Sequence, residues 1–184
     1  MRRLLLLLPV VVLAGCGSER TPVPDITHAV APVGTKAYEL SGGAVRFTAP
    51  GNWDTMPPEG SLAGGVRSRT ATVAVWRYER TEPLPDSRKA LKAAGARLTA
   101  SAQAHDPTFR VRVTRFRHRG GGAPSIELVG AQTIAGVPVD VRSTHLFADG
   151  AEVVVDAYAP PGDFPRVDEQ VFLPLLRSLK VRRR

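Results

Sequence analysis

The sequence predicts an α+β fold in which an antiparallel β-sheet is sandwiched by helices, after an N-terminal signal and tether. Three observations support this class. Alternating apolar and polar residues between 125 and 159 form strand patterns joined by short turns. A helical pattern occupies residues 86–104, and an apolar stripe follows the strands near the C-terminus. Because every helix and sheet must bury an apolar face, helices on both sides of the sheet fit this order.

The strands are predicted to be antiparallel neighbours. A meander is expected from three consecutive strands, at residues 125–134, 137–148 and 151–159. Ala135-Gly136 joins the first two, and Asp149-Gly150, a strong hairpin signal, joins the last two. Shorter strands are expected at 38–40, 44–48, 71–79 and 109–117. Trp53 offers a core anchor, and the proline- and glycine-rich residues 54–70 are expected to form a loop.

Two helical regions flank this sheet in the predicted fold. Asp86 or Ser87 is a candidate N-cap for the first, whose stripe of mostly small residues is Leu91, Ala94, Leu98 and Ala102. Small side chains suit close packing but leave little bulk, and Gly95 lowers helix propensity. The second region has the stripe Phe164, Val167, Val171, Phe172, Leu175, Leu176 and Leu179. Pro174 is expected to kink this helix or to start a new one at its first turn.

The N-terminus has the order of residues typical of a secretion signal. Arg2 and Arg3 precede an apolar run from Leu4 to Leu13, which is shorter than the roughly 20 residues needed to span a bilayer. The next motif, Leu13-Ala14-Gly15-Cys16, resembles the lipobox of bacterial lipoproteins. This resemblance implies removal of residues 1–15, a diacylglycerol on the Cys16 sulfur and an N-acyl chain. Cys16 is the only cysteine, so it cannot form an internal disulfide.

The rest of the chain is predicted to be a tether and one domain. Residues 16–37 are assigned to the lipidated cysteine and a flexible tether, 38–181 to a single α+β domain, and 182–184 to a basic tail. This organisation predicts an exported protein that is lipid-anchored to the outer face of the cytoplasmic membrane, in the cell envelope. The membrane is therefore the first expected partner.

Three segments resemble the PsbP-like superfamily, named for an extrinsic subunit of the photosynthetic oxygen-evolving complex. They are Phe-Thr-Ala-Pro-Gly-Asn-Trp at 47–53, the long meander, and Leu-Leu-Arg-Ser-Leu at 175–179. The superfamily also includes a nuclear-import factor that binds the GTPase Ran. The resemblance covers most of residues 44–181 and implies an α/β/α sandwich. Its members share an architecture and not a catalytic site, so no family binding residue is assigned here.

The chain is basic, with a formal net charge of +8 that falls to +6 when residues 1–15 are removed. Export argues against nucleic acid as a partner and favours anionic lipid or an acidic wall polymer. A candidate anionic-surface site is the row Arg110, Arg112, Arg115, Arg117 and Arg119. Strict alternation splits this row over two faces, so a bulge near Thr114 would be needed to unite it. The alternative is a solvated strand whose charges prevent edge-to-edge pairing.

A second candidate combines Ser143, His145 and Asp156. A two-residue turn at Asp149-Gly150 places Ser143 opposite Asp156, and His145 on the same face opposite Val154. A hydroxyl, an imidazole and a carboxylate in contact are the elements of a hydrolytic triad. A polar seam in the sheet explains the same residues, and the Gly-x-Ser-x-Gly elbow of many hydrolases is absent. No catalytic residue is therefore assigned.

No metal and no cofactor beyond the covalent lipid are expected. The histidines have no ligand spacing, and a phosphate-binding Gly-x4-Gly-Lys loop is absent. The sequence predicts a non-enzymatic envelope lipoprotein that binds an envelope protein or component, with tethering raising its local concentration. One alternative is a lipid or amphiphile carrier with an apolar cavity between sheet and helices, because the first helix lacks bulk. A Ser-His-Asp hydrolase is the third hypothesis.

Overall fold

The computed structural model describes residues 27–40, 43–117 and 123–182. The predicted lipobox with Cys16 lies outside these residues, as do Arg119 and the last two residues of the predicted basic tail. Within the described part, no helix has the length and apolar character needed to cross a membrane.

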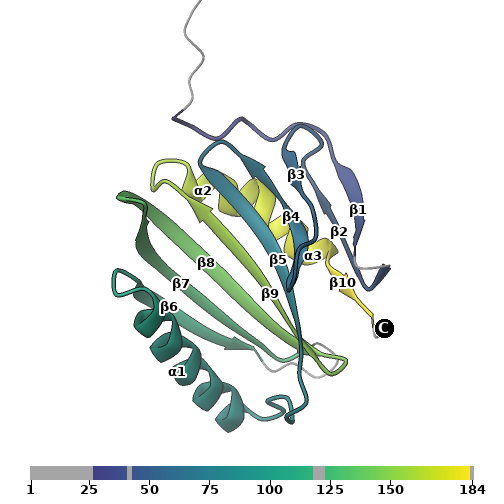
Figure 1. The fold of residues 1–184 in the computed structure, drawn as a ribbon, viewed down its shortest axis with the longest axis vertical. Coiled ribbons are helices and arrows are strands. Elements are labelled where there is room, and N and C mark those ends of the chain that lie inside the picture. Colours follow the sequence, from purple (N-terminus) through teal and green to yellow (C-terminus); the bar gives the residue numbers. More distant parts are fainter. Residues whose placement is uncertain (1–26, 41–42, 118–122, 183–184) are drawn as a thin grey trace, which may run out of the picture.

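Two antiparallel sheets and two helical regions form the structure (Figure 1). The large sheet has seven strands in the order β3-β4-β5-β9-β8-β7-β6. Their bounds are Asp54–Met56 (β3), Leu62–Ser68 (β4), Ala71–Glu79 (β5), Arg110–Arg117 (β6), Ser125–Ile134 (β7), Val137–Ala148 (β8) and Ala151–Ala159 (β9). A small sheet has the order β1-β2-β10, with bounds Lys36–Leu40, Val45–Ala49 and Lys180–Val181.

Helices cover both faces of the large sheet, as predicted for the α+β class. Helix α1 (Arg88–His105) lies over β6 and β7 on one face (Figure 1). The other face carries a continuous C-terminal helical region, made of α2 (Phe164–Val167), the π-helical turn η2 (Asp168–Phe172) and α3 (Leu173–Ser178). Pro174 lies in the first turn of α3, which is the second of the two placements expected for it.

The meander agrees with the predicted pattern residue by residue. Strands β7, β8 and β9 have the expected bounds and are paired in antiparallel register. Asp149 and Gly150 both have positive φ values, 53° and 75°, as a two-residue hairpin turn of type I′ requires. The register that positions the side chains of β8 against those of β9 is therefore set by this turn.

The predicted loop at residues 54–70 is wrong, because this segment contains β3 and β4. Its glycines permit close packing within a sheet. A Cβ at Gly65 would lie 2.4 Å from the carbonyl oxygen of Val73 in β5, and one at Gly64 would lie 2.4 Å from a methyl carbon of Leu40. These glycines resemble a loop signal in the sequence, but in the structure they allow β4 to lie close to its neighbours.

Helix α1 begins as predicted, with Ser87 as its N-cap. The Ser87 hydroxyl oxygen accepts a hydrogen bond of 3.2 Å from the backbone N–H of Ala90. Gly95, which lowers the helix propensity, is also explained by packing. A Cβ at Gly95 would lie 2.6 Å from a ring carbon of Phe116, so its absence lets the helix rest directly on β6.

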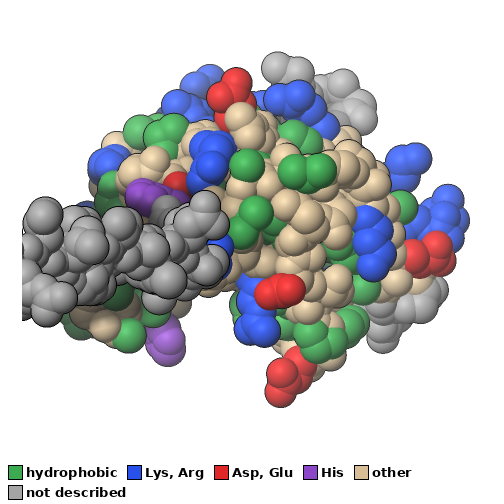
Figure 2. All heavy atoms as spheres, turned by 90° about the horizontal axis from the view of Figure 1, so that it is seen from above, with side chains coloured by type: hydrophobic (Ala, Val, Ile, Leu, Met, Phe, Trp, Pro, Cys, Tyr) green, Lys and Arg blue, Asp and Glu red, His purple; other side chains and the backbone are tan. Residues whose placement is uncertain are grey.

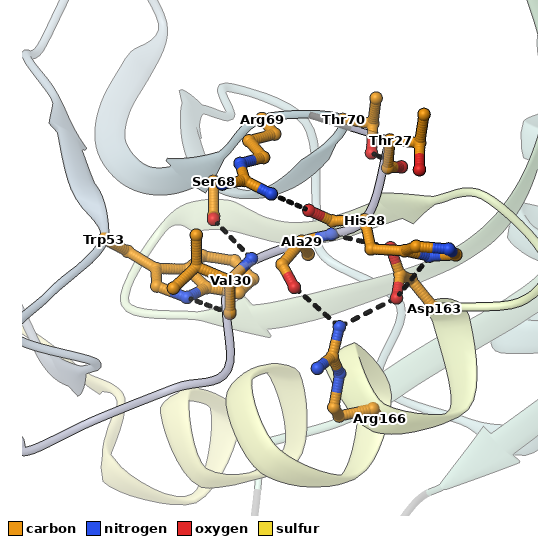
Figure 3. Close-up of polar contacts among 10 residues, drawn as sticks. All are labelled: Thr27, His28, Ala29, Val30, Trp53, Ser68, Arg69, Thr70, Asp163 and Arg166. Atoms are coloured by element: carbon orange, nitrogen blue, oxygen red, sulfur yellow. Dashed lines mark hydrogen bonds and ion pairs between the residues drawn. The ribbon is translucent and has the colours of Figure 1, made fainter. Parts of the chain in front are cut away.

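The folded part of the chain starts before residue 38, so the predicted tether is too long at its C-terminal end. The Ala29 N–H donates to Asp163 Oδ2 (2.7 Å), and the Ala29 carbonyl accepts from Arg166 (2.6 Å) (Figure 3). The Val30 N–H donates to the Ser68 hydroxyl (3.0 Å). Buried polar side chains therefore hold this extended segment on the domain beside the start of α2.

Trp53 is a core anchor, as predicted. Its side chain is buried, and its indole N–H donates to the Val30 carbonyl over 3.1 Å (Figure 3). The surrounding core joins the small sheet, β5, β9 and the C-terminal helical region, with Phe172 and Leu175 fully buried. This second contact fixes the N-terminal segment to the same core.

Candidate functional site

A cavity of about 690 Å³ lies between α1 and the face of the large sheet formed by β5, β8 and β9. It exists because α1 rests on β6 and β7 and leaves the neighbouring strands uncovered. Its apolar wall consists of Leu98, Ala102, Phe109, Leu128, Val141 and Val154. The two helix residues of this wall, Leu98 and Ala102, belong to the predicted stripe of mostly small side chains.

The floor of the cavity is polar. The floor residues are Tyr78, Arg80, Ser143, His145, Glu152, Asp156 and Tyr158. Strand alternation explains why they gather, since β9 places residues 152, 154, 156 and 158 on this one face. Ser143 lies opposite Asp156, and His145 lies opposite Val154, so the predicted register is confirmed.

A chain of hydrogen bonds runs through these side chains. Ser143 Oγ lies 3.1 Å from His145 Nε2, and His145 Nδ1 lies 2.6 Å from Glu152 Oε1. Arg80 Nε donates to Glu152 Oε2 over 2.9 Å. The backbone N–H of Arg80 also donates to the Gly150 carbonyl (2.9 Å), which holds this arginine beside the turn between β8 and β9.

The carboxylate within hydrogen-bond distance of His145 is Glu152, and not Asp156, which the Ser-His-Asp hypothesis placed there. Glu152 lies opposite Phe147, so it is the diagonal neighbour of His145 on the same face. Strand counting that included diagonal pairs would have identified it. Asp156 instead lies beside the Ser143 hydroxyl, at the other end of the chain of hydrogen bonds.

The two carboxyl groups have opposite electrostatic environments. Burial opposes ionisation of Glu152, but the hydrogen bonds from His145 and Arg80 outweigh it, so the pKa of Glu152 is lowered. At Asp156 burial dominates and raises the pKa, although Ser143, the charge of His145, Trp76 and Tyr158 partly offset it. Glu152 is therefore a compensated charge, whereas Asp156 is a carboxylate that burial disfavours.

The tyrosines beside Asp156 remain neutral hydroxyl groups. Burial raises the pKa of Tyr158, and the charge of Asp156 adds to this effect. Burial and the charges of Asp156 and Glu152 likewise raise the pKa of Tyr78. The guanidinium carbon of Arg80 lies 5.7 Å from the centroid of the Tyr78 ring, within cation–π range.

A second cavity, of about 390 Å³, adjoins the first beside α1. The two share Arg80, Leu98, Ser101 and Glu152 in their linings. The second is otherwise bounded by the segment that leads into α1, including Pro83, Leu84 and Pro85. Together they extend the space available beside the helix beyond the polar floor.

The predicted arginine row lies on β6, at the edge of the large sheet. A bulge is present, but it lies between Val111 and Val113, upstream of the expected position near Thr114. Arg112 forms an ion pair with Asp140 (2.6 Å), and Arg115 forms one with Glu127 (2.5 Å). These pairs balance part of the positive charge of the row.

The remaining arginines of the described row, Arg110 and Arg117, are exposed. Lys and Arg side chains are likewise dispersed among apolar and uncharged groups on the face shown in Figure 2. Binding of anionic surfaces by the row stays a prediction.

Among the described residues, no group of three or more His, Cys, Asp and Glu side chains is arranged to hold a metal ion.

Neither a family model nor a curated protein sequence matches this chain. Similarity appears in three-dimensional structure. The solution structure of cyanobacterial PsbP (CyanoP) from Synechocystis sp. PCC 6803 has a TM-score of 0.63 at 13% identity, covering 83% of this chain and 95% of that chain. LpqN, described as involved in cell envelope biogenesis of Mycobacterium tuberculosis, has a TM-score of 0.56 at 13% identity, covering 80% and 90% respectively.

PA94 from Pseudomonas aeruginosa also has a similar structure. Its TM-score is 0.53 at 15% identity, and the match covers 82% of this chain and 99% of that chain. At such low sequence identities, the structural similarity shows a shared fold and leaves activity, ligands and partners open. The chain therefore has the PsbP-like α+β fold that its sequence predicts.

Proposed function

We propose that this protein is a membrane-anchored envelope lipoprotein whose domain binds an amphiphilic envelope component in the cavity beside α1. The observation that carries the proposal is the cavity itself, which combines an apolar wall with a polar floor. Its volume of about 690 Å³ is within the usual range of small-molecule sites, which is roughly 300–1,000 Å³. Such a lining suits a ligand with an alkyl body and a polar head.

The anchor and the location are supported by sequence and by one structural neighbour. The lipobox-like motif ending in Cys16 supports lipidation. LpqN, whose structure is similar, is involved in cell envelope biogenesis, and this similarity supports a place in the envelope. Because the chain is held on the domain from Ala29 onward, a lipid on Cys16 would keep the cavity within a short distance of the membrane.

Ligand recovery tests the proposal. The full chain carrying Cys16→Ser, which cannot be lipidated, is purified and extracted with organic solvent, and the extract is analysed by mass spectrometry. Ala102→Trp places an indole in the cavity wall, and we expect it to abolish recovery of the amphiphile. Ala93→Trp makes the same change on the exposed side of α1 and should leave recovery unchanged. Equal recovery from both variants, or none from Cys16→Ser itself, contradicts binding in this cavity.

The Ser143–His145–Glu152 geometry supports a second candidate function, hydrolysis of an ester. His145 is within hydrogen-bond distance of both the hydroxyl and the carboxylate, as a serine nucleophile and its base require. Against this, the single Ser143 proton can be donated to His145 or to Asp156 but not to both. Binding without catalysis is therefore the primary proposal.

Fluorophosphonate labelling distinguishes the two functions. A hydrolase predicts labelling of the Cys16→Ser chain that Ser143→Ala abolishes and Glu152→Gln strongly reduces. Asp156→Asn should preserve labelling, since Asp156 does not contact His145 in the described hydrogen bonds. An unlabelled protein, or labelling that survives Ser143→Ala, removes the hydrolase hypothesis.

A further inference from the structure

We propose that Asp156 is the recognition point for a cationic head group, so that the ligand of the cavity is an alkylamine-type amphiphile. The inference rests on the proposed function, since it names the chemical class of ligand for the same cavity. The alternative ligands are neutral and anionic amphiphiles of equal chain length, and the experiment below distinguishes them from the cationic one.

The two carboxylates on the cavity floor differ in their partners. Glu152 has two cationic or polar partners, Arg80 and His145, and needs no further charge. Asp156 takes part in no ion pair among the residues that the structure describes; those ion pairs engage other acids, Glu152 among them. Of the two carboxylates on the cavity floor, Asp156 is therefore the one left for a ligand.

The groups that face Asp156 stabilise its carboxylate only in part. Ser143 lies directly opposite Asp156 in the register of β8 and β9, and Ser143, the charge of His145, Trp76 and Tyr158 each act to lower the pKa of Asp156 against its burial. Hydroxyl and indole groups stabilise a carboxylate without supplying a positive charge, and His145 is already paired with Glu152. A buried charge that lacks an opposite charge is costly, and a cation that enters the cavity would remove that cost.

The rest of the cavity suits a cation attached to an apolar body. The rings of Tyr78 and Tyr158 line the same floor, and the Tyr78 ring already accommodates a guanidinium group, that of Arg80. Aromatic faces attract cations. Leu98, Ala102 and Phe109 form the wall along which an alkyl chain would lie.

Calorimetric titration of the full Cys16→Ser chain provides the test, with three probes of equal chain length: decylammonium and decyl sulfate, each below its micelle concentration, and decanol, below its solubility limit. We expect decylammonium to bind about tenfold or more tightly than decanol, the gain typical of one charge-assisted hydrogen bond, and decyl sulfate to bind most weakly. Ala102→Trp should weaken the binding of every probe that occupies the cavity.

Asp156→Asn removes the charge and keeps the size of the side chain. This variant should bind decylammonium no better than decanol, whereas Asp54→Asn, at an exposed residue of β3 outside the cavity lining, should keep the wild-type preference. Since Asp156 has no ion pair to lose, we expect the Asn variant to remain folded, as its thermal unfolding will show. Burial raises the pKa of Asp156, so the preference for decylammonium should also decline on acidification of the wild-type protein, while decanol binding should not.

The groups that can titrate near Asp156 are His145, Glu152, Tyr78 and Tyr158, and Arg80 is the neighbouring fixed charge. Equal affinity for decylammonium and decanol, or a preference that survives Asp156→Asn, overturns the cationic head group and leaves the cavity as a site for neutral amphiphiles. If none of the three probes binds, or if Ala102→Trp leaves their binding unchanged, the proposed function is overturned as well.

Discussion

Replacing Glu152 by glutamine tests whether the polar floor is an electrostatically compensated unit. Glu152 is only 3% exposed and accepts hydrogen bonds from both Arg80 and His145. Glutamine keeps the size of the side chain and one carbonyl acceptor. It removes the negative charge and places an amide N–H₂ group against one of the two donors.

The expected loss follows from these contacts. A hydrogen bond to a charged group is worth about 1.5–3 kcal/mol, and both bonds of Glu152 are of this kind. The Arg80 side chain is 40% exposed, so water can replace part of its interaction. Most of the loss then arises at the buried His145. We expect the free energy of unfolding to fall by about 2–3 kcal/mol at pH 7.

The loss should depend on pH in a defined direction. Burial opposes ionisation of Glu152, but hydrogen bonds from His145 and Arg80 lower its pKa below the ordinary value of 4.5. A carboxylate with a lowered pKa contributes stability above its unfolded-state pKa and loses that contribution as the pH falls through the folded-state pKa. The difference between the wild type and Glu152→Gln should therefore be complete at pH 7 and shrink below about pH 4.5.

Urea unfolding followed by the fluorescence of Trp53 and Trp76 measures this difference at each pH. Glu39→Gln is a matched control, because its ion pair with Arg46 is exposed on both sides, with side-chain exposures of 57% for Glu39 and 42% for Arg46. Its expected cost is below about 1 kcal/mol. A Glu152→Gln cost no larger than that of Glu39→Gln, or one that persists unchanged in acid, would refute the reasoning.

Three further substitutions test the packing of the scaffold. Asp163→Ala removes the acceptor for Ala29 and should destabilise the protein by about 2 kcal/mol and speed proteolysis before Val33; unchanged proteolysis contradicts a docked segment. Gly95→Ala should lower stability by about 1–2 kcal/mol despite higher helix propensity, because the new Cβ would meet Phe116 at 2.6 Å; a raised melting temperature contradicts this. Ser87→Ala should cost about 1 kcal/mol in thermal unfolding, and no change would show that the cap is dispensable.

Sequence reasoning works best here where the pattern is local. The turn at Asp149-Gly150 fixes the register of β8 and β9, and from that register the neighbourhood of Ser143 and Asp156 follows by counting. Helix α1 was predictable from its cap and its stripe. In each case the determining interactions lie within a few residues of the signal.

The errors arise where contacts distant in sequence decide the conformation. Gly64 and Gly65 lie in β4 because Leu40 and β5 occupy the space that side chains would need, and composition alone indicated a loop. The segment around Ala29 is ordered by Asp163, a residue 134 positions away. The role of Glu152 was missed because only directly opposite pairs were counted, whereas its contact with His145 is diagonal.

Photoaffinity labelling tests the central claim most directly. A decylamine that carries a diazirine in its chain is irradiated with the full Cys16→Ser protein, and labelled peptides are identified by mass spectrometry. Binding beside α1 predicts adducts in α1 and around Phe109, with loss of these adducts in Ala102→Trp and their retention in Ala93→Trp. Adducts confined to other parts of the chain, such as the small sheet or the apolar N-terminal run, would contradict it.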